Sequence, residues 1–198
     1  MPRVTLTVLA LIVVTACSGP SATAPAPVVS VAQATGSPAS PPPPAAGPFE
    51  PGTITFSGIT SADALASYSE RGLAIALTGA EWTGSLTYGN GAPFVLFRSA
   101  AGVSTTGTAE LNGGGQLFSF VSVDLYSSTT KIPYTITGLR GGSTVFTLSN
   151  IVPNTFGNFK TIEAPDPGVQ IDTLRIALTN NAAPCCPNPV GLDNIIVR

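Results

Sequence analysis

The stretch Asp172-Thr173-Leu174-Arg175-Ile176-Ala177-Leu178-Thr179 alternates between two kinds of side chain. Leu174, Ile176 and Leu178 occupy the even positions, and smaller or polar residues occupy the odd ones. Successive side chains of a β-strand point to opposite faces, so a period of two predicts a strand with one face in a core. This is the clearest secondary-structure signal in the chain.

Shorter runs with the same texture precede and follow it, and glycine, asparagine or proline separates them. They cover residues 53–56, 73–77, 94–98, 116–126, 132–136, 146–148 and 190–197. Within 116–126, we expect Leu117, Val121, Val123 and Leu125 to share one face. Residues 61–70 alone suggest a helical turn. Short strands at this spacing predict an all-β sandwich or barrel, here of about 8–10 strands.

The first 48 residues have a different composition. Nine prolines and no charged residue lie between Ser18 and Pro48, so this segment cannot bury enough apolar surface to fold. Arg3 and the apolar run 4–14 before it predict a secretory signal, too short to span a bilayer of about 30 Å. The expected organisation is a signal at 1–17, a disordered Pro/Ala-rich linker at 18–48 and a β-sandwich domain at 49–198.

The signal ends in Val14-Thr15-Ala16-Cys17, which resembles the lipobox of bacterial lipoproteins. That resemblance implies that Cys17 is lipidated, with palmitate-type chains, and tethers the protein to a membrane of the cell envelope. The residue after the cysteine is Ser18 and not an aspartate, and the resemblance therefore implies sorting to the outer membrane in a host with two membranes. The alternative is an ordinary signal cut near Ala16, which leaves Cys17 as a plain thiol.

Composition excludes several classes of function. The chain has eight basic and ten acidic residues, a formal charge of −2 and no basic cluster, which argues against nucleic acid as a partner. It contains no histidine, so neither a histidine-based nucleophilic site nor a zinc site with imidazole ligands can form.

The order of the strands resembles that of jelly-roll, galactose-binding-like domains found in bacterial exported proteins, including those with a PEP-CTERM sorting tail. The matching segments cover about residues 52–198: Ile54-Thr55-Phe56, Gly72-Leu73-Ala74-Ile75, Phe118 to Leu125, Ile136 to Gly142, Ile171 to Leu178, and Gly191-Leu192-Asp193-Asn194-Ile195-Ile196-Val197. The resemblance implies a jelly-roll β-sandwich similar to carbohydrate-binding modules. It carries no catalytic signature.

A ligand site is suggested by Trp82, the only tryptophan, in a glycine-bounded stretch near Tyr88. An exposed indole beside a phenol can stack on a sugar ring, with Glu81 or Asn90 hydrogen-bonding its hydroxyls. The other interpretation is that Trp82 packs against one end of the sandwich.

Asp193 has the same strand parity as Ile195 and Val197, which places its carboxylate at the edge of the core. A buried carboxylate needs a partner. In the sugar-binding relatives that the chain resembles, a calcium ion often lies near this closing strand, which implies a possible structural calcium at Asp193. Alternatively, the carboxylate accepts backbone N–H bonds from a neighbouring loop.

Cys185 and Cys186 are the two remaining cysteines. In an oxidising compartment, a vicinal disulfide that fixes a tight turn is the favoured interpretation. It is strained, because adjacent α-carbons lie about 3.8 Å apart. Free thiols or weak metal binding are the alternatives.

Three functions remain in contention. The favoured one is a lipid-anchored envelope protein whose domain is a non-catalytic binding or adhesion module, with polysaccharide as the ligand class. The second is a structural domain that binds another envelope protein. The third is a hydrolase using an acidic pair drawn from Glu110, Asp124, Glu163, Asp166 and Asp172.

Overall fold

The computed structural model describes residues 47–87, 91–181 and 188–198, and these residues form two antiparallel β-sheets and no helix. The expected signal and linker lie outside the described residues. Thirteen strands are present in the described part of the chain: β1 (Gly52–Ile54), β2 (Ser67–Glu70), β3 (Leu73–Thr78), β4 (Trp82–Ser85), β5 (Phe94–Arg98), β6 (Thr105–Asn112), β7 (Phe118–Ser127), β8 (Ile132–Arg140), β9 (Ser143–Val152), β10 (Lys160–Glu163), β11 (Gln170–Ile171), β12 (Thr173–Asn180) and β13 (Pro189–Val197).

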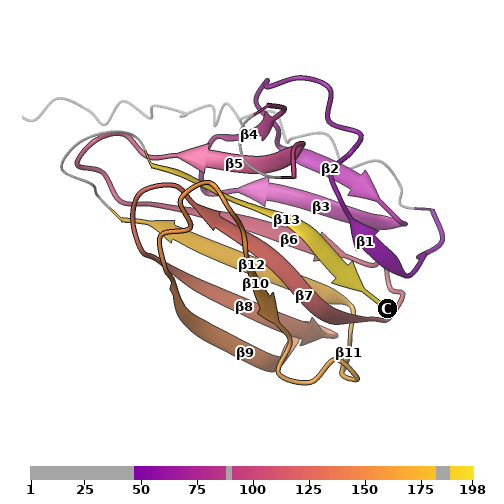
Figure 1. The fold of residues 1–198 in the computed structure, drawn as a ribbon. Coiled ribbons are helices and arrows are strands. Elements are labelled where there is room, and N and C mark those ends of the chain that lie inside the picture. The colour runs from indigo at the N-terminus through magenta and orange to yellow at the C-terminus, as the bar shows by residue number, and fades with distance from the viewer. Residues whose placement is uncertain (1–46, 88–90, 182–187) are drawn as a thin grey trace, which may run out of the picture. The chain divides into compact units, whose positions relative to one another are not determined.

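Eight of these strands form a jelly roll. One sheet has the order β10-β7-β13-β5 and the other has the order β6-β12-β8-β9, so the chain crosses repeatedly from sheet to sheet. Figure 1 shows β13 running between β5 and β7. The predicted all-β jelly-roll sandwich is confirmed. The expected number of 8–10 strands is exceeded because five short strands extend this core.

The added strands enlarge both sheets. β4 pairs with β5, β1 with β13 and β11 with β7, which gives a seven-stranded sheet. β2 and β3 extend the other sheet beyond β6, which gives six strands. Of these added strands, β4 forms the edge of the seven-stranded sheet next to β5, where the candidate site lies.

The core lies between the two sheets and follows the alternation of the strands. In β12, Leu174, Ile176 and Leu178 are fully buried and Arg175 is exposed, as the period of two predicts. These side chains pack with inward-facing residues of β13, β7 and β5 in one continuous hydrophobic cluster. Burial of each large aliphatic side chain contributes about 1.5–3 kcal/mol, so this cluster dominates the stability of the fold.

Two local expectations are wrong, and the sequence did not predict β6 (Thr105–Asn112). Residues 61–70 contain no helical turn, because Ser67–Glu70 forms the edge strand β2 against β3. The strand β6 has only Ala109 and Leu111 as large or medium apolar residues facing the core, which is why its hydrophobic period is weak. In β7, Leu117 precedes the strand and is 40% exposed, while Phe118 and Phe120 are buried in its place.

Candidate functional site

A β-bulge in β13 decides which way its side chains point. Leu192 faces the core, and Ile195 also faces the core, three residues later instead of two. The pairing of β13 with β7 shifts in register between Asp193 and Ile196, and Asn194 between them has a φ of 45°. Asparagine tolerates this left-handed conformation better than most residues.

The bulge corrects the expected placement of Asp193. Asp193 does not share a face with Ile195 and Val197, because the extra residue reverses the alternation between them. Its side chain lies on the outer face of the seven-stranded sheet, opposite the core. Sequence parity could not reveal this, since a bulge is a property of the strand pair and not of one strand.

Asp193 is nevertheless buried, with an exposed fraction of 2%. The backbone N–H of Asn194 donates a hydrogen bond to its carboxylate, but Oδ1 has no hydrogen-bond partner among the described residues. Burial is the main cause that raises the pKa of Asp193 to about 7; the hydrogen bond from Asn194 acts in the opposite direction, and the negative charges of Asp124 and Glu70 contribute smaller increases. The expectation that this carboxylate accepts a backbone N–H is met only by its own neighbour.

Asp124 of β7 lies directly opposite Asp193 in the strand register. Thr161 donates a hydrogen bond from Oγ1 to Asp124 Oδ1 at 2.6 Å, and Asn194 donates one from Nδ2 to Asp124 Oδ2 at 3.0 Å. Both oxygens of Asp124 are therefore occupied, and Asp193 retains the free oxygen of the pair. Sequence reasoning missed Asn194 as a partner, although the Asp193-Asn194 dipeptide was visible in the chain.

The described residues do not complete a calcium site at Asp193. Calcium takes six to eight oxygen ligands, often from several carboxylates. No group of three acidic, histidine or cysteine residues that could hold a metal occurs within residues 47–87, 91–181 and 188–198. Calcium at Asp193 stays a prediction, and the residues shown here supply one free carboxylate oxygen towards it.

Three aromatic rings lie beside this carboxylate pair on the outer face. Phe94, Tyr126 and Phe159 pack with ring centroids 5.2–5.6 Å apart. A methyl group built on Gly91 would lie 3.5 Å from Asp193 Oδ2 and 3.6 Å from the ring of Phe159. The chain at Gly91 therefore passes over the carboxylate and the ring, which explains how a side chain on the outer face becomes buried.

A groove of about 360 Å³ is lined by residues of the paired strands β4 and β5, by residues 86 and 87 after β4, and by Ala62. We call it the β4–β5 groove. Its lining includes hydroxyl side chains, two leucines and one cation: Thr83, Ser85, Leu86, Thr87, Leu96 and Arg98. Thr83 pairs in register with Leu96, so these two share the outer face of the sheet. Leu96 is buried at 2% exposure and Leu86 is 39% exposed, which gives the groove an apolar floor and an apolar rim.

The expectation of an exposed Trp82 is wrong. Trp82 begins β4, has an exposed fraction of 1% and packs edge-on against Phe97, with ring centroids 4.8 Å apart. Its Nε1 donates a hydrogen bond to the carbonyl oxygen of Thr78 at 3.0 Å. Trp82 pairs in register with Phe97, which faces the core, and the two side chains therefore lie on the same inner face of the sheet. The alternative interpretation, packing within the sandwich, is the one that the structure shows.

Of the other residues of that expected site, one is described and two lie outside the described residues. Glu81 is exposed next to Trp82. Tyr88 and Asn90 lie outside the described residues, so their expected roles stay predictions. No sugar-stacking arrangement around Trp82 remains, because its ring is not accessible.

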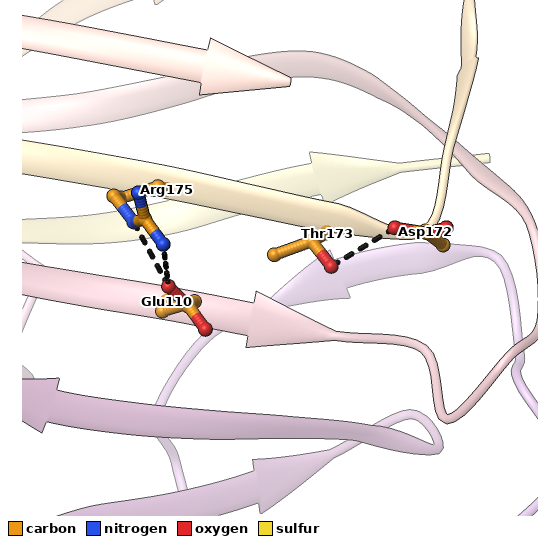
Figure 2. Close-up of polar contacts among 4 residues, drawn as sticks. All are labelled: Glu110, Asp172, Thr173 and Arg175. Atoms are coloured by element: carbon orange, nitrogen blue, oxygen red, sulfur yellow. Dashed lines mark hydrogen bonds and ion pairs between the residues drawn. The ribbon is translucent and has the colours of Figure 1, made fainter. Parts of the chain in front are cut away.

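The five carboxylates considered for hydrolysis lie on both sheets and in the loops. Arg175 Nη2 lies 2.6 Å from Glu110 Oε2 on the outer face of the six-stranded sheet, and Figure 2 shows this ion pair at a distance along β12 from Asp172. Asp172 accepts hydrogen bonds from the Gly141 N–H and the Thr173 hydroxyl, which hold its pKa below the ordinary value. Asp124 lies on β7 of the other sheet, and Glu163 lies on the neighbouring strand β10, two residues after Thr161, the register partner of Asp124. Glu163 and Asp166 are exposed. A catalytic pair among these five residues stays a prediction.

The cysteine predictions lie outside the described residues, which exclude Cys17, Cys185 and Cys186. The structure does show how the chain is held on both sides of residues 182–187. Asn180 donates from Nδ2 to the Asn188 carbonyl oxygen at 2.6 Å, and Asn188 donates from Nδ2 to Thr130 Oγ1 at 2.9 Å. Both asparagines are buried, so the hydrogen bonds of their side-chain amide groups hold Asn180 and Asn188 in place.

No described segment forms a helix with the length and hydrophobicity needed to cross a membrane.

Comparison with known proteins gives weak similarities of structure. No protein-family model matches the chain, and no curated protein matches it. The carbohydrate-binding module TmCBM61 in complex with β-1,4-galactotriose has a TM-score of 0.42 and 11% identity, over 63% of this chain and 87% of that one. The enzymatically active domain of tailspike protein 4 from bacteriophage CBA120 has a TM-score of 0.40 and 13% identity, over 63% of this chain.

A third similarity is to the N-terminal endo-1,4-β-D-xylanase 10B of Clostridium thermocellum, with a TM-score of 0.38, 15% identity and 74% of this chain covered. The present chain spans 28% of that xylanase structure and 19% of the tailspike structure. Similarities at this level do not establish a family or a ligand.

Proposed function

We propose that this chain is a lipid-anchored cell-envelope protein whose β-sandwich binds glycans without catalysing a reaction. The observation that carries the binding is the β4–β5 groove, because it combines hydroxyl side chains with an apolar floor. Sugar rings present hydroxyl groups at their edges and C–H groups on their faces. A concave site with a few placed polar groups on an apolar lining matches both.

The strand β4 provides the polar side of the groove. Thr83 and Ser85 are two residues apart on one strand, so they lie on the same face and line the same wall. Leu96 of β5 pairs in register with Thr83 and forms the apolar floor of the groove. Because both strands belong to the sheet, the hydroxyl groups are held on a rigid frame, which lowers the entropic cost of binding.

The non-catalytic part of the proposal rests on chemistry. The chain has no histidine, and the described lining of the groove contains no carboxylate. Glycoside hydrolysis with two carboxyl groups needs them about 5–9.5 Å apart on either side of the scissile bond. The groove offers neither the acid nor the base for that reaction.

Lipid anchoring is supported by the sequence alone. The run 4–14, the tetrapeptide ending in Cys17 and the proline-rich segment after it form a signal, an attachment point and a spacer in the order that tethering requires. Two or more acyl chains are needed for stable anchoring, and lipidation of this bacterial type supplies them.

The experiment is a glycan array followed by calorimetric titration with the glycans that bind. The test variant is Thr83→Val, which removes a hydroxyl from the groove while keeping a β-branched side chain. The matched control is Thr108→Val on β6, another half-buried strand threonine, on the other sheet. We expect Thr83→Val to weaken binding and Thr108→Val to leave it unchanged. Failure of the array to detect any polysaccharide contradicts the proposal.

A domain that binds another envelope protein is a second candidate, and one observation favours it. The edge strand β9 exposes Val145 at 44% and Ile151 at 56%, and its outer backbone edge pairs with no other strand among the described residues. Edge strands with apolar side chains are places where another chain can pair. Cross-linking in the native envelope, with and without Ile151→Lys, distinguishes this candidate, because a β9 partner is lost in the variant and a glycan ligand is not.

A further inference from the structure

Arg98 stands at the end of β5 and lines the β4–β5 groove. Its side chain is exposed, and no hydrogen bond or ion pair engages it among the described residues. It pairs in register with Pro189, whose side chain has no acceptor for the guanidinium group. The guanidinium group is therefore available to a ligand in the groove.

Two other arginines, Arg71 and Arg175, each contact a second strand or turn of the fold. Arg71 donates from Nε to the Thr53 carbonyl oxygen at 2.7 Å, and this contact fastens β1 to the turn after β2. Arg175 pairs with Glu110 across β12 and β6. Arg98 has neither kind of partner among the described residues, although the chain has only eight basic residues in all.

We infer that the β4–β5 groove binds an anionic sugar unit, carboxylated or sulfated, with Arg98 as the donor to the anion. This inference rests on the proposed glycan binding and specifies its ligand class. Guanidinium groups match planar carboxylates and the oxygens of sulfate-like anions with two parallel hydrogen bonds. The sugar ring then lies over Leu96, and Thr83 and Ser85 face its hydroxyl groups.

The charge of the groove differs from the charge of the whole chain. The described lining of the groove holds one cation and no acidic residue, while the whole chain has a formal charge of −2. The molecule as a whole does not attract anions, so selectivity has to come from the contact at Arg98. A groove of about 360 Å³ is at the small end of the usual range of about 300–1,000 Å³, which suits a short segment of a polysaccharide.

The experiment compares three polysaccharide probes by calorimetry: polygalacturonate for carboxylate, dextran sulfate for sulfate and neutral galactan. The variants are Arg98→Gln, which removes the charge, and Arg98→Lys, which keeps the charge but loses the forked donor geometry. Arg140→Gln on β8 is the control, since it removes one positive charge from an exposed position on the other sheet. Thermal unfolding of each variant verifies that it is folded.

We expect wild type to bind at least one anionic probe more tightly than galactan, with affinity falling as NaCl is raised. Arg98→Gln should weaken that binding about tenfold or more, because a charge-assisted hydrogen-bonded contact is lost. Arg98→Lys should be intermediate, and Arg140→Gln should match wild type. The probe that binds identifies carboxylate or sulfate as the recognised group.

The contrary results separate this inference from the proposed function. Binding of galactan as tightly as both anionic probes, with Arg98→Gln silent, overturns the anionic ligand class and leaves glycan binding intact. Equal losses in Arg98→Gln and Arg140→Gln show general electrostatic attraction and also overturn the role of Arg98. Absence of binding to every glycan contradicts the proposed function itself.

Discussion

Asp193 and Asp124 lie opposite each other on neighbouring strands, and their carboxylates differ in their hydrogen bonds. Asp124 receives hydrogen bonds on both oxygens, from Thr161 and Asn194. Asp193 is buried and keeps Oδ1 without a partner among the described residues. Burial favours the protonated form of Asp193 and raises its pKa.

The stability of the protein should therefore depend on pH through Asp193. Burial raises the pKa of this group from 3.8 to about 7, so the folded protein holds the proton more tightly than the unfolded chain does. A group of this kind stabilises the fold fully below the unfolded pKa, and that stabilisation is lost as pH rises through about 7. The loss between about pH 4 and pH 7 amounts to roughly 4 kcal/mol.

Chemical denaturation of wild type and Asp193→Asn across this pH range measures that contribution. The variant should lose most of the decline in unfolding free energy and be more stable than wild type at pH 8. Asp63→Asn, which removes an exposed carboxylate, serves as the control and should follow wild type. Parallel curves for wild type and Asp193→Asn would show that Asp193 is charged throughout.

The calcium predicted at Asp193 should raise the stability of the folded protein, because a ligand that binds only the folded state stabilises it. Asp193 supplies one free carboxylate oxygen towards such a site. The check is the unfolding midpoint in calcium chloride and in a chelator, at a pH above 7. A rise with calcium that disappears in Asp193→Asn is the expected result, and equal midpoints in calcium and chelator would contradict it.

Asn194 should be sensitive to substitution in a specific order. Its φ of 45° favours asparagine or glycine, and its side chain bonds Asp124 at 3.0 Å. Asn194→Gly loses the hydrogen bond alone, whereas Asn194→Ala loses the bond and strains the backbone. We expect losses of about 1 kcal/mol for glycine and about 2 kcal/mol for alanine, measured by urea denaturation. Equal losses would mean that the bulge imposes no strain.

Trp82 should report burial in fluorescence. Because it is the only tryptophan and is 1% exposed, native emission should be blue-shifted and poorly quenched by iodide. Trp82→Ala should destabilise the fold by about 3–5 kcal/mol through the cavity it leaves. Strong quenching in the folded protein, or quenching relieved by a glycan, would restore the indole as a ligand platform.

If Cys17 carries the lipid, its substitution should move the protein from the membrane fraction to the aqueous fraction. Wild type should partition with membranes, and Cys17→Ala should not, because the acyl chains provide the anchoring free energy. Intact-mass measurement of the native protein should show the added acyl mass. An unmodified amino terminus in the native host would contradict the tether.

The sequence predicted the strands whose alternation is carried by large side chains. Leu174, Ile176 and Leu178 are buried on one face of β12, as their spacing indicates. β6 was not recognised, because Ala109 and Leu111 are too small or too few to give a clear period. The glycines around Trp82 hide the strand β4, whose four residues pair with β5.

The candidate site was less predictable than the fold. Parity assigned Asp193 to the core face, but the bulge at Asn194 reverses the alternation, and bulges depend on pairing between strands. Arg98 lies beside Thr83 in the groove only because β4 and β5 are antiparallel neighbours. Tertiary pairing, and not any local motif, brings these side chains together.

The most direct test of glycan binding is calorimetric titration of wild type, Thr83→Val and Thr108→Val with a polysaccharide selected on the array. Saturable binding by wild type and Thr108→Val, weakened in Thr83→Val, is the predicted result. Equal affinities for all three folded proteins would contradict the groove as the sugar site.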